Sequence, residues 1–263
     1  MSWRVALIDS CGEWPEAVDA AAFVDESGAC DTAMSGSGAA VGIAGAGMGA
    51  GVRVVRRCST MADGTGHGSR MARLLSDSNA VFELMLGQVF LGARPASAAA
   101  IAAALDWAVA GGADLIHMSL GLGADRAVLA AAVGRAVDAE CVVVASAPAR
   151  GGVVYPAAYR GVIRGTGDAR CGPGELSCLG PGFFGGCRRW VMSGVEDCAA
   201  GAGVGVGVSA GAGISAGASV GAAWVTRSIL SEPTKRDARE VIGMMTAKAK
   251  YLGPERRRLV PAI

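Results

Sequence analysis

The chain has 263 residues, of which 52% are apolar, enough to bury a substantial core in one domain. Its 24 basic and 23 acidic residues leave a formal charge of +1, so there is no excess of positive charge to neutralise a phosphate backbone. We therefore expect one domain over residues 1–263 and no nucleic-acid partner.

Short apolar runs alternate with helical segments along the chain. A strand is expected at 4–8, ending at Asp9, and another at 52–57, after a glycine-rich loop at 35–51. The later elements follow in turn: helix 66–75, a strand within 81–91, helix 96–110, strand 115–119, helix 125–139, strand 141–145, helix 216–230 and helix 235–249. Residues 168–197 show little periodicity and are predicted to be irregular. The alternation predicts an α/β fold of three layers, with a mostly parallel central sheet flanked by helices.

The uncharged run 198–226 is long enough to cross a bilayer, but its many glycines and repeated Val-Gly steps favour strand and turn over a membrane helix. No export signal is recognisable before the first strand. We therefore expect no membrane partner, a cytoplasmic location and free thiols at the eight cysteines.

Three separated blocks carry the residues of a hydrolytic site. Asp9 ends the first strand, His67 lies in the Asp-Gly-Thr-Gly-His-Gly-Ser block at 63–69, and Ser215 directly precedes a helix. A serine hydroxyl is a weak nucleophile, so a histidine must accept its proton and a carboxylate must orient the imidazole. Asp63 is expected to be a turn residue that supports the histidine block.

In their order along the chain and in their local sequence, the three blocks resemble the Asp, His and Ser motifs of the subtilisin-like serine peptidases, family S8. Residues 113–121 are similar to the family strand that pairs with substrate, and residues 142–147 to the strand beside its oxyanion hole. The resemblance implies a subtilisin-like fold without metal or organic cofactor, and a catalytic triad of Asp9, His67 and Ser215. It also implies a substrate-binding site between two backbone edges, formed by Ser119, Leu120, Gly121, Ala145, Ser146 and Ala147.

The chain departs from the family pattern at the oxyanion hole, where Ala149 stands in place of the usual Asn. Loss of such a donor costs on the order of 3 kcal/mol of transition-state stabilisation. Candidate donors are the backbone amide of Ser215 and the side chains of Arg150 and Ser146. Ser209 and Ser219 lie in similar glycine-rich surroundings and remain alternative nucleophiles. The second histidine, His117, is expected to be a hydrogen-bonded core residue.

The resemblance implies a serine endopeptidase that removes a leader from a modified peptide or small protein subunit, so its partner is a peptide or protein substrate. The alternative is a catalytically weak or inactive protease-like scaffold that binds an extended peptide along Ser119–Gly121 by β-augmentation. A third hypothesis, a nucleotide-binding α/β protein, comes from the glycine-rich segment 211–216 before a helix. It is the weakest, because the acidic residue expected about twenty positions later is only loosely placed.

Overall fold

The computed structural model describes residues 2–11, 14, 16–25, 52–56, 63–77, 80–90, 95–191, 214–235 and 237–255. For residues 24–25, 52–56 and 214–216 the description covers the backbone alone. The strands of the main sheet are β1 (Trp3–Asp9), β2 (Asp19–Asp25), β3 (Val52–Arg56), β4 (Phe82–Gln88), β5 (Leu115–Met118), β6 (Val142–Ser146), β7 (Val162–Asp168), β8 (Ser177–Gly180), β9 (Phe183–Cys187) and β12 (Tyr251–Leu252).

These ten strands lie in the order β12-β8-β9-β7-β6-β5-β1-β4-β2-β3. Their pairing is parallel except between β2 and β3 and between β8 and β9. Two short strands, β10 (Arg189–Val191) and β11 (Ile214–Ala216), form a separate antiparallel ribbon. One sheet thus gathers strands from the two ends of the described chain, while the single domain over 1–263 stays a prediction.

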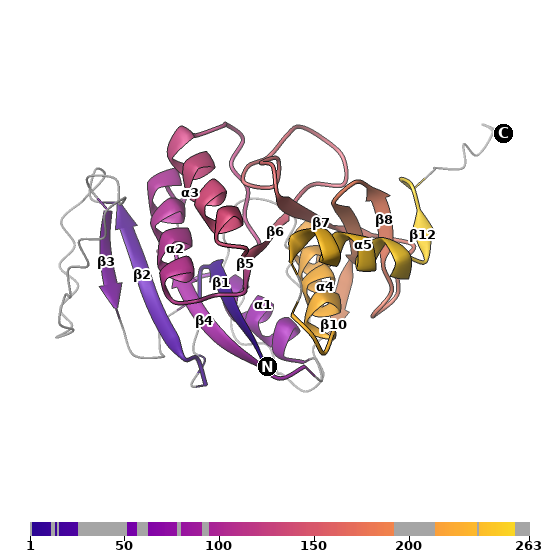
Figure 1. Cartoon of the computed structure of the whole chain (residues 1–263), viewed down its shortest axis with the longest axis horizontal. Helices are drawn as coiled ribbons and strands as arrows, with labels where there is room; N and C mark the ends of the chain where they lie inside the picture. Colours follow the sequence, from indigo (N-terminus) through magenta and orange to yellow (C-terminus); the bar gives the residue numbers. More distant parts are fainter. Residues whose placement is uncertain are drawn as a thin grey trace.

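Helices cover both faces of the sheet, which makes the fold three-layered as predicted (Figure 1). One face carries α2 (Ala98–Ala110) and α3 (Ala127–Asp138), and the other carries α1 (His67–Ser76), α4 (Ala218–Leu230) and α5 (Ala238–Lys248). Side chains along β1 alternate between the two cores: Ala6 and Ile8 pack toward α2 and α3, and Leu7 packs toward α1 and α4. The same alternation turns Asp9 toward α1.

Helix α4 lies directly on the sheet because glycines line the contact. A β-carbon at Gly221 would lie 2.0 Å from the carbonyl oxygen of Thr166 in β7. On the sheet side, a β-carbon at Gly165 would lie 2.6 Å from Cα of Ala222, and one at Gly186 would lie 2.6 Å from Cβ of Trp224. The backbones of α4, β7 and β9 therefore touch without side chains between them.

Most of the predicted elements are confirmed within one or two residues at each end: strands 4–8, 52–57, 115–119 and 141–145, the strand within 81–91, and four of the five helices. The helix predicted at 235–249 is also present but begins three residues later, at Ala238. The prediction that 168–197 is irregular is wrong, because β8, β9 and β10 lie there. β2 and β7 were also not expected. β7 and β9 each contain two glycines, which weaken any strand signal but allow the close approach of α4. The glycine-rich loop 35–51 lies outside the described residues.

No helix among the described residues combines the length and apolarity needed to span a bilayer. Much of the uncharged run 198–226 lies outside those residues, but its last part forms α4, which packs on the sheet.

Candidate active site

Asp9 and His67 form a hydrogen-bonded pair at the end of β1. Asp9 is the last residue of the strand and His67 is the first residue of α1. Nδ1 of His67 lies 2.8 Å from Oδ1 and 3.0 Å from Oδ2 of Asp9. Asp9 is 1% exposed, whereas the His67 side chain is 24% exposed. The carboxylate is thus inside the protein while the imidazole reaches the surface.

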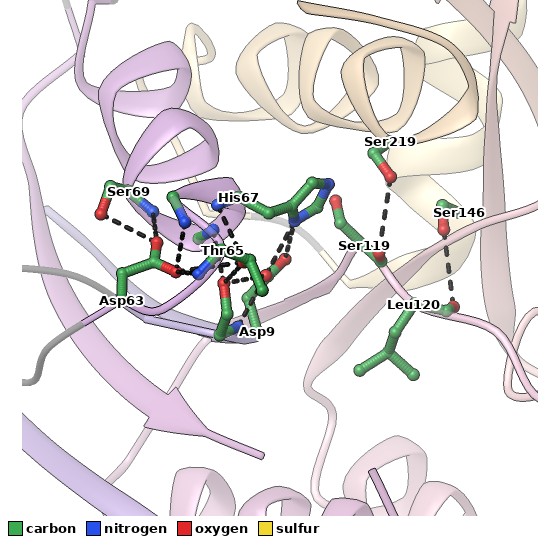
Figure 2. A network of polar contacts seen from close by, with 12 residues as sticks. Asp9, Asp63, Thr65, His67, Ser69, Ser119, Leu120, Ser146 and Ser219 are labelled. Atoms are coloured by element: carbon green, nitrogen blue, oxygen red, sulfur yellow. Dashed lines mark hydrogen bonds and ion pairs between the residues drawn. The ribbon is translucent and has the colours of Figure 1, made fainter. Parts of the chain in front are cut away.

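Asp63 builds the turn that presents His67, as its sequence context predicts. Its carboxylate accepts hydrogen bonds from the backbone N–H of Gly66 at 2.7 Å and of Ser69 at 2.8 Å, and from the Ser69 hydroxyl at 2.9 Å. The contacts from Asp63 to Ser69 are drawn in Figure 2. They flank the left-handed Gly66, which has a φ of 66° and precedes the helix. The turn fixes where α1 begins and hence where His67 lies.

Ser10 and Thr65 join this turn to the end of β1. The Ser10 hydroxyl donates to Oδ1 of Asp9 at 3.2 Å and accepts from the backbone N–H of Gly68 at 2.9 Å. The Thr65 hydroxyl lies 2.9 Å from Oγ of Ser10 and accepts from the backbone N–H of His67 at 3.1 Å. Neither role was predicted, although Ser10 directly follows Asp9 and Thr65 lies within the block 63–69 that contains His67.

The electrostatics of the pair suit a general base. Burial raises the pKa of Asp9, but the His67 charge and hydrogen bonds from His67 and Ser10 lower it by more, so the pKa lies below 3.8. Burial also lowers the pKa of His67, but the charge and hydrogen bond of Asp9 raise it above 6.5. Near neutral pH the site therefore holds an ionised carboxylate beside an imidazole that accepts a proton readily.

The other histidine, His117, is a buried, hydrogen-bonded residue of β5, as predicted. Its Nδ1 lies 2.8 Å from Oγ1 of Thr226 and its Nε2 lies 2.7 Å from Oγ of Ser119. Burial lowers its pKa to about 4, against a smaller raising effect of the Asp9 charge; His67 adds the smallest contribution, a lowering. His117 is therefore neutral at physiological pH.

The three candidate nucleophiles are described to different extents. Ser215 lies in β11, opposite Trp190, and its side chain is outside the described part. The sequence places it at a helix N-terminus, but α4 begins only at Ala218, after Gly217 turns the chain with a φ of 116°. Ser219 lies in the first turn of α4, where its hydroxyl donates to the Ser119 carbonyl at 3.4 Å. Ser209 lies outside the described residues.

The predicted substrate edges meet at the same end of the sheet as Asp9. Ser119, Leu120 and Gly121 directly follow β5, which lies between β1 and β6. Ala145 and Ser146 end β6, and the backbone N–H of Ala147 donates to Gly165 of β7 at 2.8 Å. In Figure 2, the His67 ring turns from Asp9 toward the side where Ser119 and Ser219 lie.

The two side chains considered as oxyanion donors differ in setting. The Ser146 hydroxyl is buried and donates to the Leu120 carbonyl at 3.5 Å, so it would have to turn away to bind another oxygen. Arg150 is exposed in the loop after β6, beside the exposed Ala149. The structure thus brings Ser146 to the substrate edges and leaves Arg150 at the surface.

Metal and thiol chemistry have little support in the part of the chain that the structure describes. No group of three or more His, Cys, Asp or Glu there could hold a metal ion. Five cysteines are described, all as free thiols: Cys11, Cys141, Cys171, Cys178 and Cys187. Burial and the negative charge of Asp9 raise the pKa of Cys11, the cysteine closest in sequence to Asp9.

No known protein family matches this sequence, and no curated protein is significantly similar to it. Among solved structures, the chain is similar to the prenylagaramide maturation protease PagA, at 20% identity over 39% of this chain and 42% of that chain, with a TM-score of 0.34. The chain thus covers less than half of that protein. A likeness of this extent carries no argument, and what supports a function is the contact between Asp9 and His67.

Proposed function

We propose that this protein is a serine endopeptidase with Asp9, His67 and Ser215 as its catalytic triad. The observation that carries the proposal is the buried carboxylate of Asp9, 2.8 Å from Nδ1 of His67, whose side chain is 24% exposed. The partial exposure of the imidazole leaves it accessible to a peptide. The carboxylate holds the proton on Nδ1, which leaves Nε2 free to accept one.

In the proposed reaction, Nε2 of His67 removes the proton from the serine hydroxyl as Oγ attacks the carbonyl carbon of the peptide. The tetrahedral intermediate collapses when the imidazolium gives this proton to the leaving amine, and the C–N bond breaks. Water then repeats the sequence on the acyl-enzyme, releasing the acid and regenerating Ser215. No metal or cofactor takes part.

The choice of Ser215 over Ser219 is supported by two features. Ser215 lies two residues before Gly217, which turns the chain into α4, so backbone N–H groups at the start of that helix can face the developing negative charge. Ser219 already donates its hydroxyl proton to the Ser119 carbonyl. We propose the backbone amide of Ser215 as the first oxyanion donor, with Arg150 or Ser146 as the second.

The proposed substrate is an extended peptide lying between Ser119–Gly121 and Ala145–Ala147, in the cytoplasm and without nucleic-acid or membrane partners. Because the usual oxyanion Asn is replaced by Ala149, a slow and selective reaction is expected. Removal of a leader from a modified peptide or small subunit fits such a reaction. In this the chain resembles the small bacterial subtilisin-like proteases, including the one that matures quinohemoprotein amine dehydrogenase.

Labelling with a fluorophosphonate tests the proposal directly. The wild type is compared with Ser215→Ala, Ser209→Ala and Ser219→Ala, and the labelled peptide is identified by mass spectrometry. We expect labelling to be lost in Ser215→Ala alone and to require His67. Labelling that persists in Ser215→Ala would show that another serine is the nucleophile.

The second candidate function is a protease-like scaffold that binds an extended peptide without cleaving it. The replacement of the oxyanion Asn by Ala149 favours it. Under this alternative no form of the protein is labelled or hydrolyses peptides, yet peptide binding survives in Asp9→Asn. The same set of variants therefore separates the two functions.

A further inference from the structure

We propose that His117 is a positioning residue, which through its contacts with Thr226 and Ser119 makes the Ser119 hydroxyl a hydrogen-bond donor toward a carbonyl of the bound peptide. The inference rests on the proposed function only for the presence of a peptide beside Ser119. The hydrogen-bond chain itself is a property of the fold.

The three side chains form a continuous line from the interior to the substrate edge. Thr226 lies on α4 and His117 on β5, and both are fully buried at 0% exposure. Ser119 lies one residue beyond β5 and is 8% exposed. Leu115 and His117 are two residues apart on β5, so their side chains point to the same face of the sheet. Leu115 packs in the core under α1 and α4. The line of three side chains therefore lies on the same face as Asp9 and His67.

A neutral imidazole carries one N–H and one acceptor nitrogen, so its two neighbours must take opposite roles. Among the described residues, the Thr226 hydroxyl has His117 as its only hydrogen-bond partner. A fully buried hydroxyl proton without an acceptor is costly, which favours donation from Thr226 to Nδ1 of His117. The proton of the imidazole is then on Nε2.

The Nε2–H group donates to Oγ of Ser119 at 2.7 Å, which uses an acceptor position of that hydroxyl. The Ser119 proton is left pointing away from His117, and the side chain, which is buried but still 8% exposed, can offer it to a ligand. The backbone of Ser119 is held by α4 as well, because its carbonyl accepts from Ser219. These contacts thus fix where Ser119 lies and leave its hydroxyl as a donor toward the substrate side.

Two properties keep His117 in this state. Its pKa of about 4, which burial causes in spite of the raising effect of Asp9, prevents protonation at neutral pH. The nearby charged groups, Asp9 on β1 and His67 on α1, are already paired with each other.

The test uses imidazole ¹⁵N NMR of the full chain, whose only two histidines are His67 and His117. His67→Ala assigns the remaining signals to His117. We expect His117 to be neutral from pH 5.5 to pH 8 with its proton on Nε2, a result that does not depend on peptidase activity. A proton on Nδ1, or titration near pH 6.5, would overturn the positioning role.

Variants of Thr226 connect this state to the peptide. Thr226→Val keeps the side-chain shape but removes the donor, so we expect mixed tautomers at His117 and a KM raised about tenfold with kcat within about twofold of the wild type. Thr226→Ser keeps the hydroxyl and should restore both. Ser228→Ala, also on α4, is the matched control.

Ser119→Ala should raise KM as much as Thr226→Val does, and the double variant should be no worse than either single one. An unchanged KM in Ser119→Ala, with hydrolysis intact, would show that the Ser119 hydroxyl does not bind the substrate, and would overturn the proposal. Absence of hydrolysis in the wild type would instead defeat the proposed function, while the NMR result would still decide how His117 holds Ser119.

Discussion

Replacement of Asp9 by Asn keeps the shape of the side chain while removing its charge and changing one oxygen to an N–H donor. In the wild type the carboxylate lies 2.8 Å from Nδ1 of His67 and is 1% exposed. The amide would donate to Nδ1, which forces the imidazole proton onto Nε2. The nitrogen that should accept the serine proton would then be blocked.

The expected loss in kcat is on the order of 10⁴-fold, as for the same change at the orienting carboxylate of a serine protease. At about 1.36 kcal/mol per tenfold, this equals about 5.4 kcal/mol of transition-state stabilisation. Charge centres about 4 Å apart contribute about 4 kcal/mol of this at an effective dielectric constant near 20. The changed tautomer accounts for the remainder.

The assay compares single-turnover hydrolysis and the rate of fluorophosphonate labelling in wild type and Asp9→Asn, with folding checked by circular dichroism. Asp106→Asn is the matched control, because it removes a carboxylate that pairs with Arg135 at 2.8 Å between α2 and α3, on the opposite face of the sheet. We expect the control to react at the wild-type rate. A folded Asp9→Asn protein that reacted within a few-fold of wild type would refute the triad.

Three other outcomes follow from the structure. The rate of hydrolysis should fall as the pH drops through the pKa of His67, because only the neutral imidazole accepts a proton. Since Asp9 raises this pKa, the midpoint of the fall should lie above 6.5, and a midpoint well below 6.5 in a pH–rate profile would contradict this. Gly221→Ala should lower the free energy of unfolding by about 3 kcal/mol or more, since the new methyl group would lie 2.0 Å from a carbonyl oxygen of β7. Gly134→Ala in α3, where the added β-carbon would meet no atom of another element within 4 Å, should raise it by about 0.5–1 kcal/mol, and urea unfolding compares the two variants. Burial raises the pKa of the Cys141 and Cys171 thiols to about 11, so native protein at pH 8 should leave both unalkylated by iodoacetamide in peptide mapping.

The pairing of Asp9 with His67 could be predicted because each residue carries a local signal. An apolar run ends at Asp9, and the glycine-rich block around His67 opens a helix with Asp63 as its turn residue. Parallel strands place their carboxyl ends at one edge, so the approach of the two blocks follows from the fold class. The alternation of strands and helices likewise predicts the three layers.

Other features depend on contacts that no local pattern reveals. β11 exists because it pairs with β10, about 25 positions earlier in the chain, and this pairing keeps Ala216 in a strand and Ser215 away from the helix N-terminus predicted for it. β7 and β9 were missed because their glycines are selected by contact with α4. The link between His117 and Thr226 joins residues 109 positions apart, although an isolated polar residue in each apolar segment is a signal that could have suggested it.

The glycine seam between α4 and the sheet has a practical consequence for engineering. Its spacing is set by main-chain atoms, which have no rotamers to exchange, so remodelling of apolar side chains elsewhere cannot raise or tilt the helix. Libraries that vary the layer of α2 and α3 can therefore be screened for heat tolerance, while cleavage preference is varied on the opposite layer. The two properties should respond to selection independently.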